Sequence, residues 1–313
     1  MRAIAISAFG ARPELVELPE PVPGPGELLV RLRAAAYNPV DTKIASGAMT
    51  GLSPRFPLIM GQDAAGVVEA VGAEVTAYGP GDEVYGRFSD PARGLGGYAE
   101  YGVVAQDGPV ARMPKGLLPE QAAAVPTASA TAYALVETAE LAEGRTVLIV
   151  GATGGVGQAA TQLAALRRAY VIATAAPDAE DLMSDLGANE TVDHTKGDVP
   201  GQVLAAWPDG IDAVFDLATP AGAVDAMAGV LRPGGVICSV IHALDPDALA
   251  ARGLRGVNVI NRVTPEVLTS LAELIDGGEL RVRVESLVPL ERAPAVLRDI
   301  AAGHARGKTV ITI

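Results

Sequence analysis

The chain has 313 residues, enough for two domains at about 100 to 200 residues each. Hydrophobic residues make up 49% and charged residues 19%, which excludes a disordered chain. The formal net charge of −13 repels phosphate backbones and anionic lipid headgroups, so we expect neither nucleic acid nor a membrane surface as a partner. Cys238 is the single cysteine and cannot close an intrachain disulfide, which indicates a reducing compartment, the cytoplasm.

The first part of the chain has the pattern of an antiparallel β domain. The segment from Met1 turns polar at Arg12, too soon for a secretory signal, so we expect it to form a first strand. No apolar run approaches the roughly 18 residues of a membrane span. Short β-branched runs broken by glycine and proline predict four further strands, over Glu27–Leu32, Gly66–Val71, Asp82–Tyr85 and Ala99–Val104.

From about residue 120 the pattern changes to apolar strands separated by helical stretches, which is typical of a doubly wound parallel sheet. A strand over Thr146–Val150 leads into a predicted helix over Gly155–Arg168. Further strands are predicted over Tyr170–Ala173, Thr191–Asp193, Ala213–Leu217, Gly235–Ile241 and Val257–Ile260. The last of these is flat and apolar, and we expect it to be an uncovered edge of the sheet.

The end of the chain returns to the pattern of the first part. It predicts a strand over Arg283–Val288, a helix over Glu291–Ala302 and a strand over Thr309–Ile313. We therefore expect a discontinuous β-rich domain of residues 1–119 and 280–313, with a dinucleotide-binding domain of residues 120–279 inserted in it.

A glycine-rich segment connects the strand at Thr146–Val150 to the helix that follows, in the order that a dinucleotide-binding loop requires. Its glycines permit a tight turn, a close approach of the backbone to a pyrophosphate, and close packing of the helix on the sheet. Unpaired N–H groups and the dipole at the helix start favour the anion without a side-chain cation. We predict that Gly151, Thr153, Gly154, Gly155, Val156 and Gly157 bind the cofactor.

The end of the second strand of this domain bears on which cofactor is bound. An acidic residue about 20 residues after the loop would bind the ribose 2′-OH of NADH. This chain has Ala173-Thr174-Ala175-Ala176 there, which favours NADPH over NADH and makes Thr174 a binding residue. Acidic residues begin at Asp178, however, and the cations that could reach a 2′-phosphate are Arg167, Arg168, Lys196 and Arg306.

Short motifs follow one another in a specific order along nearly the whole chain. They are Tyr37-Asn38-Pro39-Val40-Asp41, Gly61–Val68, Gly81–Gly86, Gly96–Tyr101, Thr131-Ala132-Tyr133, the glycine loop, Leu231–Gly235 and Gly307-Lys308. Together they resemble the zinc-independent quinone oxidoreductase branch of the medium-chain dehydrogenase/reductase family. The resemblance implies an α/β protein in which a Rossmann doubly wound parallel sheet accompanies a GroES-like β-rich domain, with the active site in the cleft.

The resemblance also implies site residues outside the glycine loop. Tyr37, Asn38 and Asp41 are the implied catalytic residues, although Asn-Pro followed by Asp also makes an ordinary turn. The implied further cofactor-binding residues are Asn38, Thr127, His194, Ile241 and Lys308. His194 either hydrogen-bonds the adenosine end or lies exposed in a loop, and His242 is either a general acid or a loop residue without a chemical role.

No metal is expected. Zinc-dependent relatives bind the catalytic metal through a Cys near the Asn38 position, a Gly-His-Glu motif where this chain has Gly61-Gln62-Asp63, and a further Cys. Three scattered histidines and one cysteine do not supply about four zinc ligands.

These features together predict an NADPH-dependent reductase that passes hydride to a quinone or an α,β-unsaturated carbonyl. Without zinc as a Lewis acid, electron-poor acceptors are favoured. The alternative is a dinucleotide-binding structural or regulatory protein with negligible turnover. By resemblance to relatives that pair the edge strands of their Rossmann sheets, we also expect a homodimer formed through Val257–Ile260.

Overall fold

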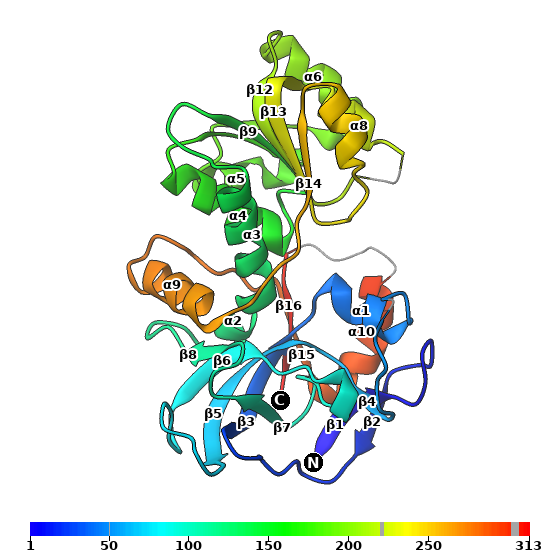
Figure 1. The fold of residues 1–313 in the computed structure, drawn as a ribbon, viewed down its shortest axis with the longest axis vertical. Coiled ribbons are helices and arrows are strands. Elements are labelled where there is room, and N and C mark those ends of the chain that lie inside the picture. Colours follow the sequence, from blue (N-terminus) through cyan, green and yellow to red (C-terminus); the bar gives the residue numbers. More distant parts are fainter. Residues whose placement is uncertain (50, 220–221, 302–306) are drawn as a thin grey trace. The chain divides into compact units, whose positions relative to one another are not determined.

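The computed structural model describes residues 1–49, 51–219, 222–301 and 307–313. These residues form two compact units, one of residues 1–130 and 263–313 and the other of residues 131–262. In Figure 1 the first unit contains both the blue N-terminal strands and the red C-terminal strand. The mixed α/β fold class predicted from the sequence is confirmed, with a parallel sheet in one unit and an antiparallel β domain in the other.

The first unit is built on two sheets. In the smaller sheet β1 (Arg2–Ile6) lies between β2 (Glu14–Glu17) and β4 (Leu58–Ile59). The larger sheet has the order β15 (Ser286–Pro289), β16 (Thr309–Thr312), β3 (Glu27–Ala36), β5 (Asp63–Val71), β6 (Glu83–Arg87) and β8 (Val110–Arg112), and β7 (Tyr101–Ala105) also pairs with β3. All its pairs are antiparallel except β15 with β16, so the pairing predicted for this part of the chain is largely present.

Short helices complete the first unit. They are α1 (Pro39–Ala45), α2 (Pro119–Ala123), α9 (Pro265–Asp276) and α10 (Ala293–Ala301), with 3₁₀ turns at Pro91–Arg93 and Leu290–Arg292. Helix α2 packs on β3 and β5, α9 packs on β8, and the Tyr85 hydroxyl donates a hydrogen bond of 2.6 Å to the Leu268 carbonyl. These contacts place α2 and α9 in the first unit, so its boundaries differ from those at 119 and 280 expected from the sequence.

Two elements near the end of the chain differ from their predicted bounds. The strand predicted over Arg283–Val288 begins only at Ser286, because its parallel pairing with β16 begins where Ser286 faces Thr309. The helix predicted from Glu291 begins at Ala293, after the 3₁₀ turn, and its predicted last residue, Ala302, lies outside the described residues.

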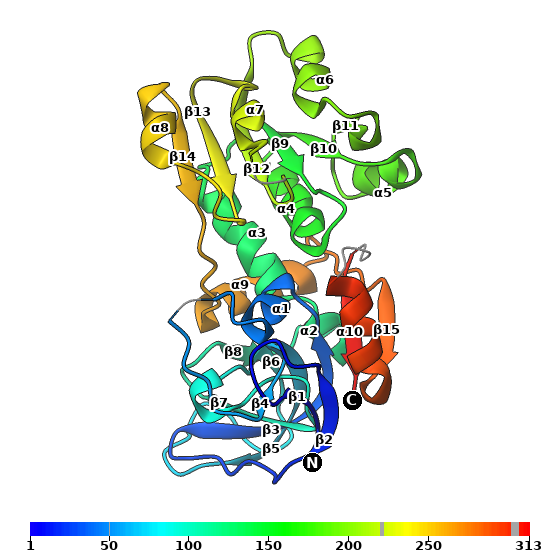
Figure 2. The ribbon, with the colours of Figure 1, turned by 90° about the vertical axis from the view of Figure 1, so that its right-hand side faces the viewer.

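The second unit is a six-stranded parallel sheet with helices. Its order is β11 (Glu190–Val192), β10 (Tyr170–Thr174), β9 (Thr146–Val150), β12 (Ile211–Asp216), β13 (Leu231–Ser239) and β14 (Arg255–Asn258), and every pair is parallel. The helices are α3 (Pro126–Thr138), which begins in the first unit, α4 (Gly155–Leu166), α5 (Glu180–Asp185), α6 (Val199–Ala206), α7 (Val224–Ala228) and α8 (Pro246–Ala251). Short 3₁₀ turns cover Pro177–Ala179 and His194–Lys196. Figure 2 shows α8 along β14 at one edge of the sheet and α5 beside β11 at the other.

The edge strand β14 lies two residues earlier than the predicted Val257–Ile260. It therefore includes Arg255 and ends at Asn258, and none of its residues is fully buried. Ile260 follows the strand with 72% of its surface exposed. The predicted bounds and apolar character of this strand are thus wrong, although the strand does lie at the edge of the sheet.

Each unit has its own apolar core. Large buried side chains such as Ile4, Leu28 and Phe88 fill the first, and Leu148, Ile172 and Val214 belong to the second. Among the helices of the described residues, none is both long enough and apolar enough to span a membrane.

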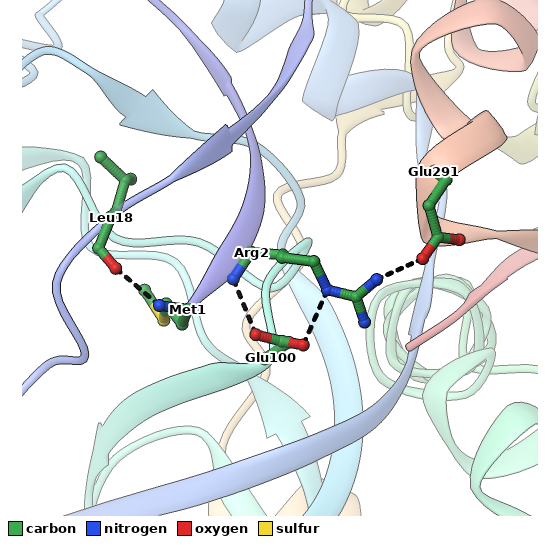
Figure 3. Close-up of polar contacts among 5 residues, drawn as sticks. All are labelled: Met1, Arg2, Leu18, Glu100 and Glu291. Atoms are coloured by element: carbon green, nitrogen blue, oxygen red, sulfur yellow. Dashed lines mark hydrogen bonds and ion pairs between the residues drawn. The ribbon is translucent and has the colours of Figure 1, made fainter.

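Arg2 connects the N-terminal strand to the rest of the first unit through hydrogen bonds and ion pairs (Figure 3). Its backbone N–H and its Nε donate to the two carboxylate oxygens of Glu100, at 2.7 and 2.9 Å. Its guanidinium also pairs with Glu291, at the start of the C-terminal helical region. The hydrogen bond from the Arg2 backbone and the guanidinium together hold the pKa of Glu100 below its usual range.

We expect Glu100→Gln to lower the thermal unfolding midpoint more than the matched variant Glu291→Gln, because Glu100 accepts two hydrogen bonds and its side chain is 30% exposed against 51%. A carboxylate with a depressed folded-state pKa stabilises the fold above its unfolded pKa of about 4.3, and this stabilisation is lost as the pH falls through the folded value. The difference in unfolding midpoint between the wild type and Glu100→Gln should therefore become smaller at acidic pH. Equal midpoints for the two variants at neutral pH, measured by scanning calorimetry, would contradict this role for Glu100.

Candidate active site

The glycine loop lies at the carboxyl edge of the parallel sheet. Strand β9 ends at Val150, and α4 begins at Gly155 with Gly154 as its N-cap. Glycine has no side chain to cap the helix, so the first N–H groups of α4 stay available to an anion. The Gly151 N–H donates a hydrogen bond of 2.9 Å to the Thr174 hydroxyl at the end of β10, and the Gln158 amide of α4 donates to the Thr153 carbonyl at 2.8 Å. These two hydrogen bonds fix the loop to β10 on one side and to α4 on the other.

Three of the four glycines of the loop have different surroundings. Gly151 has φ +82°, a conformation that favours glycine. A β-carbon on Gly157 would lie 2.4 Å from the Gly151 carbonyl oxygen and 2.5 Å from the Cα of Ala152, so this glycine allows the helix to pack on the loop. A β-carbon on Gly154 would meet the protein only at 3.5 Å, an ordinary contact. The fold itself therefore tolerates a side chain at Gly154, and a glycine there is explained by the close approach of a pyrophosphate to the backbone.

Two buried side chains that the sequence analysis did not single out order the neighbouring loops. Asp216 ends β12 with no exposed surface, and its carboxylate accepts hydrogen bonds from the Thr219 N–H at 3.0 Å and the Ser239 hydroxyl at 2.9 Å. The same hydroxyl accepts a bond of 3.2 Å from the Ile241 N–H. The loops after β12 and β13 are thus joined at the carboxyl edge, and Ile241 lies in the second of them. The following His242 is exposed and has φ +58°.

The predicted adenosine end contains Thr174, His194 and one lysine. Thr174 is 3% exposed, and its hydroxyl is bonded to the loop, so it positions Gly151 rather than presenting a free hydroxyl. His194 is exposed in the 3₁₀ turn after β11, at the same edge as Thr174. Lys196 lies in that turn too, with its Nζ 3.3 Å from an Asp193 carboxylate oxygen.

Two of the arginines considered for a 2′-phosphate are at the wrong edge of the sheet. Arg167 ends α4, which begins at the carboxyl edge, so it and Arg168 lie at the opposite edge. They pair there with Glu137 and Glu143. The prediction that either could reach the phosphate is wrong, and Arg306 lies outside the described residues. Lys196 is the candidate that the structure places near the end of β10.

In the first unit, a buried amide connects two opposite charges. The Asn38 side-chain oxygen accepts a hydrogen bond of 2.8 Å from the Lys308 ammonium, and its nitrogen donates to an Asp63 carboxylate oxygen at 2.9 Å. Lys308 also donates to the Tyr37 carbonyl at 2.8 Å. Asn38, Asp63 and Lys308 are at most 7% exposed, and burial lowers the pKa of Lys308, against the opposing charge of Asp63. The Asn38 amide is fully used by the protein, so here it links charges, and its predicted contact with substrate stays a prediction.

Asp63 also fixes the start of α3. One carboxylate oxygen accepts the Thr127 N–H at 2.8 Å, and the other accepts the Thr127 hydroxyl at 2.7 Å. A carboxylate at a helix N-terminus satisfies an unpaired N–H and interacts favourably with the helix dipole. The structure thus brings Asn38, Thr127 and Lys308 together around Asp63, which the sequence analysis noted only as a position that lacks a metal ligand.

Asp41 lies in the first turn of α1 and is connected to this network through Asn38. Its Oδ2 accepts hydrogen bonds from the Asn38 N–H at 2.8 Å and from the Tyr98 hydroxyl at 2.7 Å. Gly61 has φ +85°, and a β-carbon there would lie 2.1 Å from the Tyr98 ring, which shows how tightly the ring is held. The Tyr37 hydroxyl lies 3.0 Å from the Thr42 hydroxyl, and burial raises the pKa of Tyr37.

The residues at the positions of the relatives' metal ligands do not fit a metal site. Asn38 and Asp63 are bonded to each other and to Lys308 and Thr127, and an ammonium beside them would repel a cation. Across the ranges that the structure describes, no three His, Cys, Asp or Glu side chains come together in a group that could hold a metal ion.

Two protein-family models match the chain. The alcohol dehydrogenase GroES-like domain matches residues 24–115, and a domain described as zinc-binding dehydrogenase matches residues 186–311. The chain is 33% identical to the chloroplastic quinone-oxidoreductase QR1 of Triphysaria versicolor, over 99% of this chain and 98% of that protein. It is 32% identical to an NADPH-dependent alkenal/one oxidoreductase of Arabidopsis thaliana, over 91% of this chain and 72% of that protein.

Solved structures agree with these similarities. A quinone oxidoreductase from Coxiella burnetii superposes with a TM-score of 0.90 at 28% identity, covering 100% of this chain and 99% of that one. A structure titled as an NAD-dependent alcohol dehydrogenase also has a TM-score of 0.90, at 31% identity, with 100% of each chain covered.

Gly154→Val and Gly157→Val should have different effects, because only the second β-carbon would clash with backbone atoms, whereas the first would make an ordinary contact. We expect Gly154→Val to stay folded and to lose dinucleotide affinity by about tenfold or more, which corresponds to about 1.4 kcal/mol or more. Gly157→Val should be poorly folded. Fluorescence titration with NADPH and NADH, together with circular dichroism, tests both. Wild-type affinity in a folded Gly154→Val protein would show that this loop does not bind the pyrophosphate.

Proposed function

The chain belongs to the medium-chain dehydrogenase/reductase family, and we propose that it transfers hydride from NADPH to a quinone or an α,β-unsaturated carbonyl without a metal ion. Its relatives support an oxidoreductase that uses a nicotinamide dinucleotide. When bound, the dinucleotide supplies the hydride. The glycine loop would hold its pyrophosphate, and the loops joined through Asp216 and Ser239 would lie beside it.

The observation that carries this proposal is the buried link Lys308–Asn38–Asp63 at the positions of the relatives' metal ligands. Removing hydride from a simple alcohol requires an alkoxide-like oxygen, which metal coordination provides by lowering the pKa of the hydroxyl. An amide that is fully hydrogen-bonded provides no such activation. In a quinone or an enone the charge develops on a conjugated oxygen, which needs only modest stabilisation and a proton.

The preference for NADPH is also part of the proposal. The segment at the end of β10 has no acid from Ala173 to Ala176, and Lys196 is exposed at the end of the neighbouring strand. Its Nζ pairs with the buried carboxylate of Asp193, but the lysine side chain itself is 74% exposed, so its ammonium can turn to a phosphate. The acidic residues from Asp178 onwards oppose this preference.

The second candidate function is a dinucleotide-binding protein with negligible turnover. The complete hydrogen bonding of Asn38 by the protein favours it, because the side chain offers no free donor to a substrate. Turnover distinguishes the two candidates. The cytoplasmic location stays a prediction, since the names of similar proteins include chloroplastic ones.

We expect the purified protein to oxidise NADPH in the presence of small quinones or enones, followed at 340 nm, and to oxidise ethanol or benzyl alcohol with NADP⁺ far more slowly. Activity should survive EDTA. kcat/KM should favour NADPH over NADH by about tenfold, the effect of about one phosphate contact. Lys196→Gln should lower the ratio of kcat/KM for NADPH to kcat/KM for NADH, whereas Lys43→Gln on α1 should leave this ratio unchanged.

Faster turnover of an alcohol than of any quinone or enone would refute the proposed reaction. Dinucleotide binding without turnover of any acceptor would favour the second candidate function. A kcat/KM preference for NADH would assign the ribose contact to Asp178 or a neighbouring acid.

A homodimer through the edge strand β14 is the remaining part of the proposal. The backbone edge of this strand is unpaired within the described sheet, and the exposed Ile260 follows it. We expect light scattering to report a dimer at micromolar concentration and Ile260→Lys to weaken it, while Leu118→Lys, at an exposed apolar residue of the first unit, should not. A wild-type monomer at that concentration would refute the proposed dimer.

A further inference from the structure

A small pocket of the first unit opens beside Asp41. Its walls come from Ile44 and Ala45 at the end of α1 and from the segment of β4 and the residues after it, including Leu58, Ile59 and Gln62. It has room for little more than one water-sized group. Most of the wall is apolar, so the Asp41 carboxylate is the charged group of this pocket.

The two carboxylate oxygens of Asp41 have different surroundings. Oδ2 accepts both hydrogen bonds, from the Asn38 N–H and from the Tyr98 hydroxyl. Oδ1 is buried and has no hydrogen-bond partner among the described residues, although the side chain is only 2% exposed. An unsatisfied buried carboxylate oxygen is costly. Because two donors already face Oδ2, a proton on this carboxyl group belongs on Oδ1.

The titratable and charged groups around Asp41 come from every neighbouring element. They are Tyr37 before α1, Asp63 on β5, Tyr98 before β7 and Lys308 before β16. Burial raises the pKa of Asp41 to about 7, and the charge of Asp63 adds to the rise, whereas the hydrogen bonds and Lys308 oppose it. Burial and the nearby Asp41 hold the pKa of Tyr98 well above its usual value, so Tyr98 stays a donor. Both protonation states of Asp41 are therefore populated near neutral pH.

We propose that Asp41 is the proton carrier of this reductase, with Oδ1 giving its proton to one hydroxyl-sized oxygen held in the pocket. This inference rests on the proposed function and names the proton donor for it. That oxygen belongs either to the substrate or to a water molecule that passes the proton on.

The proton balance of the step is complete. When the substrate receives hydride, negative charge develops on its conjugated oxygen. The O–H bond at Oδ1 breaks, and an O–H bond forms on the substrate oxygen, directly or through the water. The carboxylate of Asp41 then takes a proton back from solvent water, so that one hydride and one proton are consumed in each turnover.

Asp41→Asn is the first test, because an amide can still accept the bonds from the Asn38 N–H and Tyr98 but has no proton to give. We expect kcat to fall by about 100-fold or more, as for loss of a general acid, while KM changes much less. The limb of the wild-type pH profile near pH 7 should disappear. Glu17→Gln, which removes an exposed carboxylate from β2, is the matched control and should keep the wild-type profile.

Two measurements do not depend on turnover. Infrared difference spectra should show a protonated-carboxyl band in the wild type that disappears as the pH rises through about 7, and Asp41→Asn should lack this band. A carboxyl group with a raised folded-state pKa makes the folded protein bind more protons than the unfolded chain between about pH 4 and 7. As the pH rises from about 4 to 7, the free energy of unfolding of the wild type should therefore fall relative to that of Asp41→Asn.

A variant whose larger side chain fills the pocket shows whether the oxygen that takes the proton belongs to the substrate or to a water molecule. Ala45→Val should raise KM if the substrate oxygen enters the pocket, and should lower kcat at constant KM if a water does. The proposal is overturned if no protonated-carboxyl band titrates, or if a folded Asp41→Asn protein keeps the wild-type kcat and pH profile. A wild type that shows the band but reduces no acceptor would refute the proposed function, which is a separate result.

Discussion

The buried amide of Asn38 is the contact on which the polar network of the first unit depends. It lies between a cation and an anion that are both removed from water, and it accepts from Lys308 on one side while donating to Asp63 on the other. Burying two charges costs several kcal/mol each unless hydrogen bonds and mutual attraction offset that cost. The Thr127 and Tyr37 backbone contacts supply the further bonds. Loss of the amide would leave an ammonium and a carboxylate each short of a partner.

The same network determines the charges that surround Asp41. Lys308 is the buried cation of this network. Asp41 experiences both this cation and the anion Asp63, which oppose each other, so burial decides its protonation. A small change in either neighbouring charge therefore changes the protonation of Asp41.

Features that depend on local sequence order were predictable, and features that depend on distant contacts were not. The strand Thr146–Val150 has its predicted bounds. The pattern that predicts it lies in consecutive residues: an apolar run, then glycines, then an amphipathic helix. Asp63 binds Thr127, which lies 64 residues away, and nothing in either local segment indicates that partner. The roles of Gly154 and Gly157 likewise differ only through the backbone atoms that surround each one in the fold.

The sequence distances within the network have a consequence for folding. The Thr174 hydroxyl holds the loop around Gly151 and lies only 23 residues later, so this loop can form within one strand–helix–strand unit. The contact between Asn38 and Lys308 spans 270 residues and requires β16 to reach β3. Closing so long a loop is entropically costly and slow compared with local pairing. During refolding the chain should therefore regain its glycine loop before its buried charge network, so that the second unit acquires native local structure while the first is still incomplete.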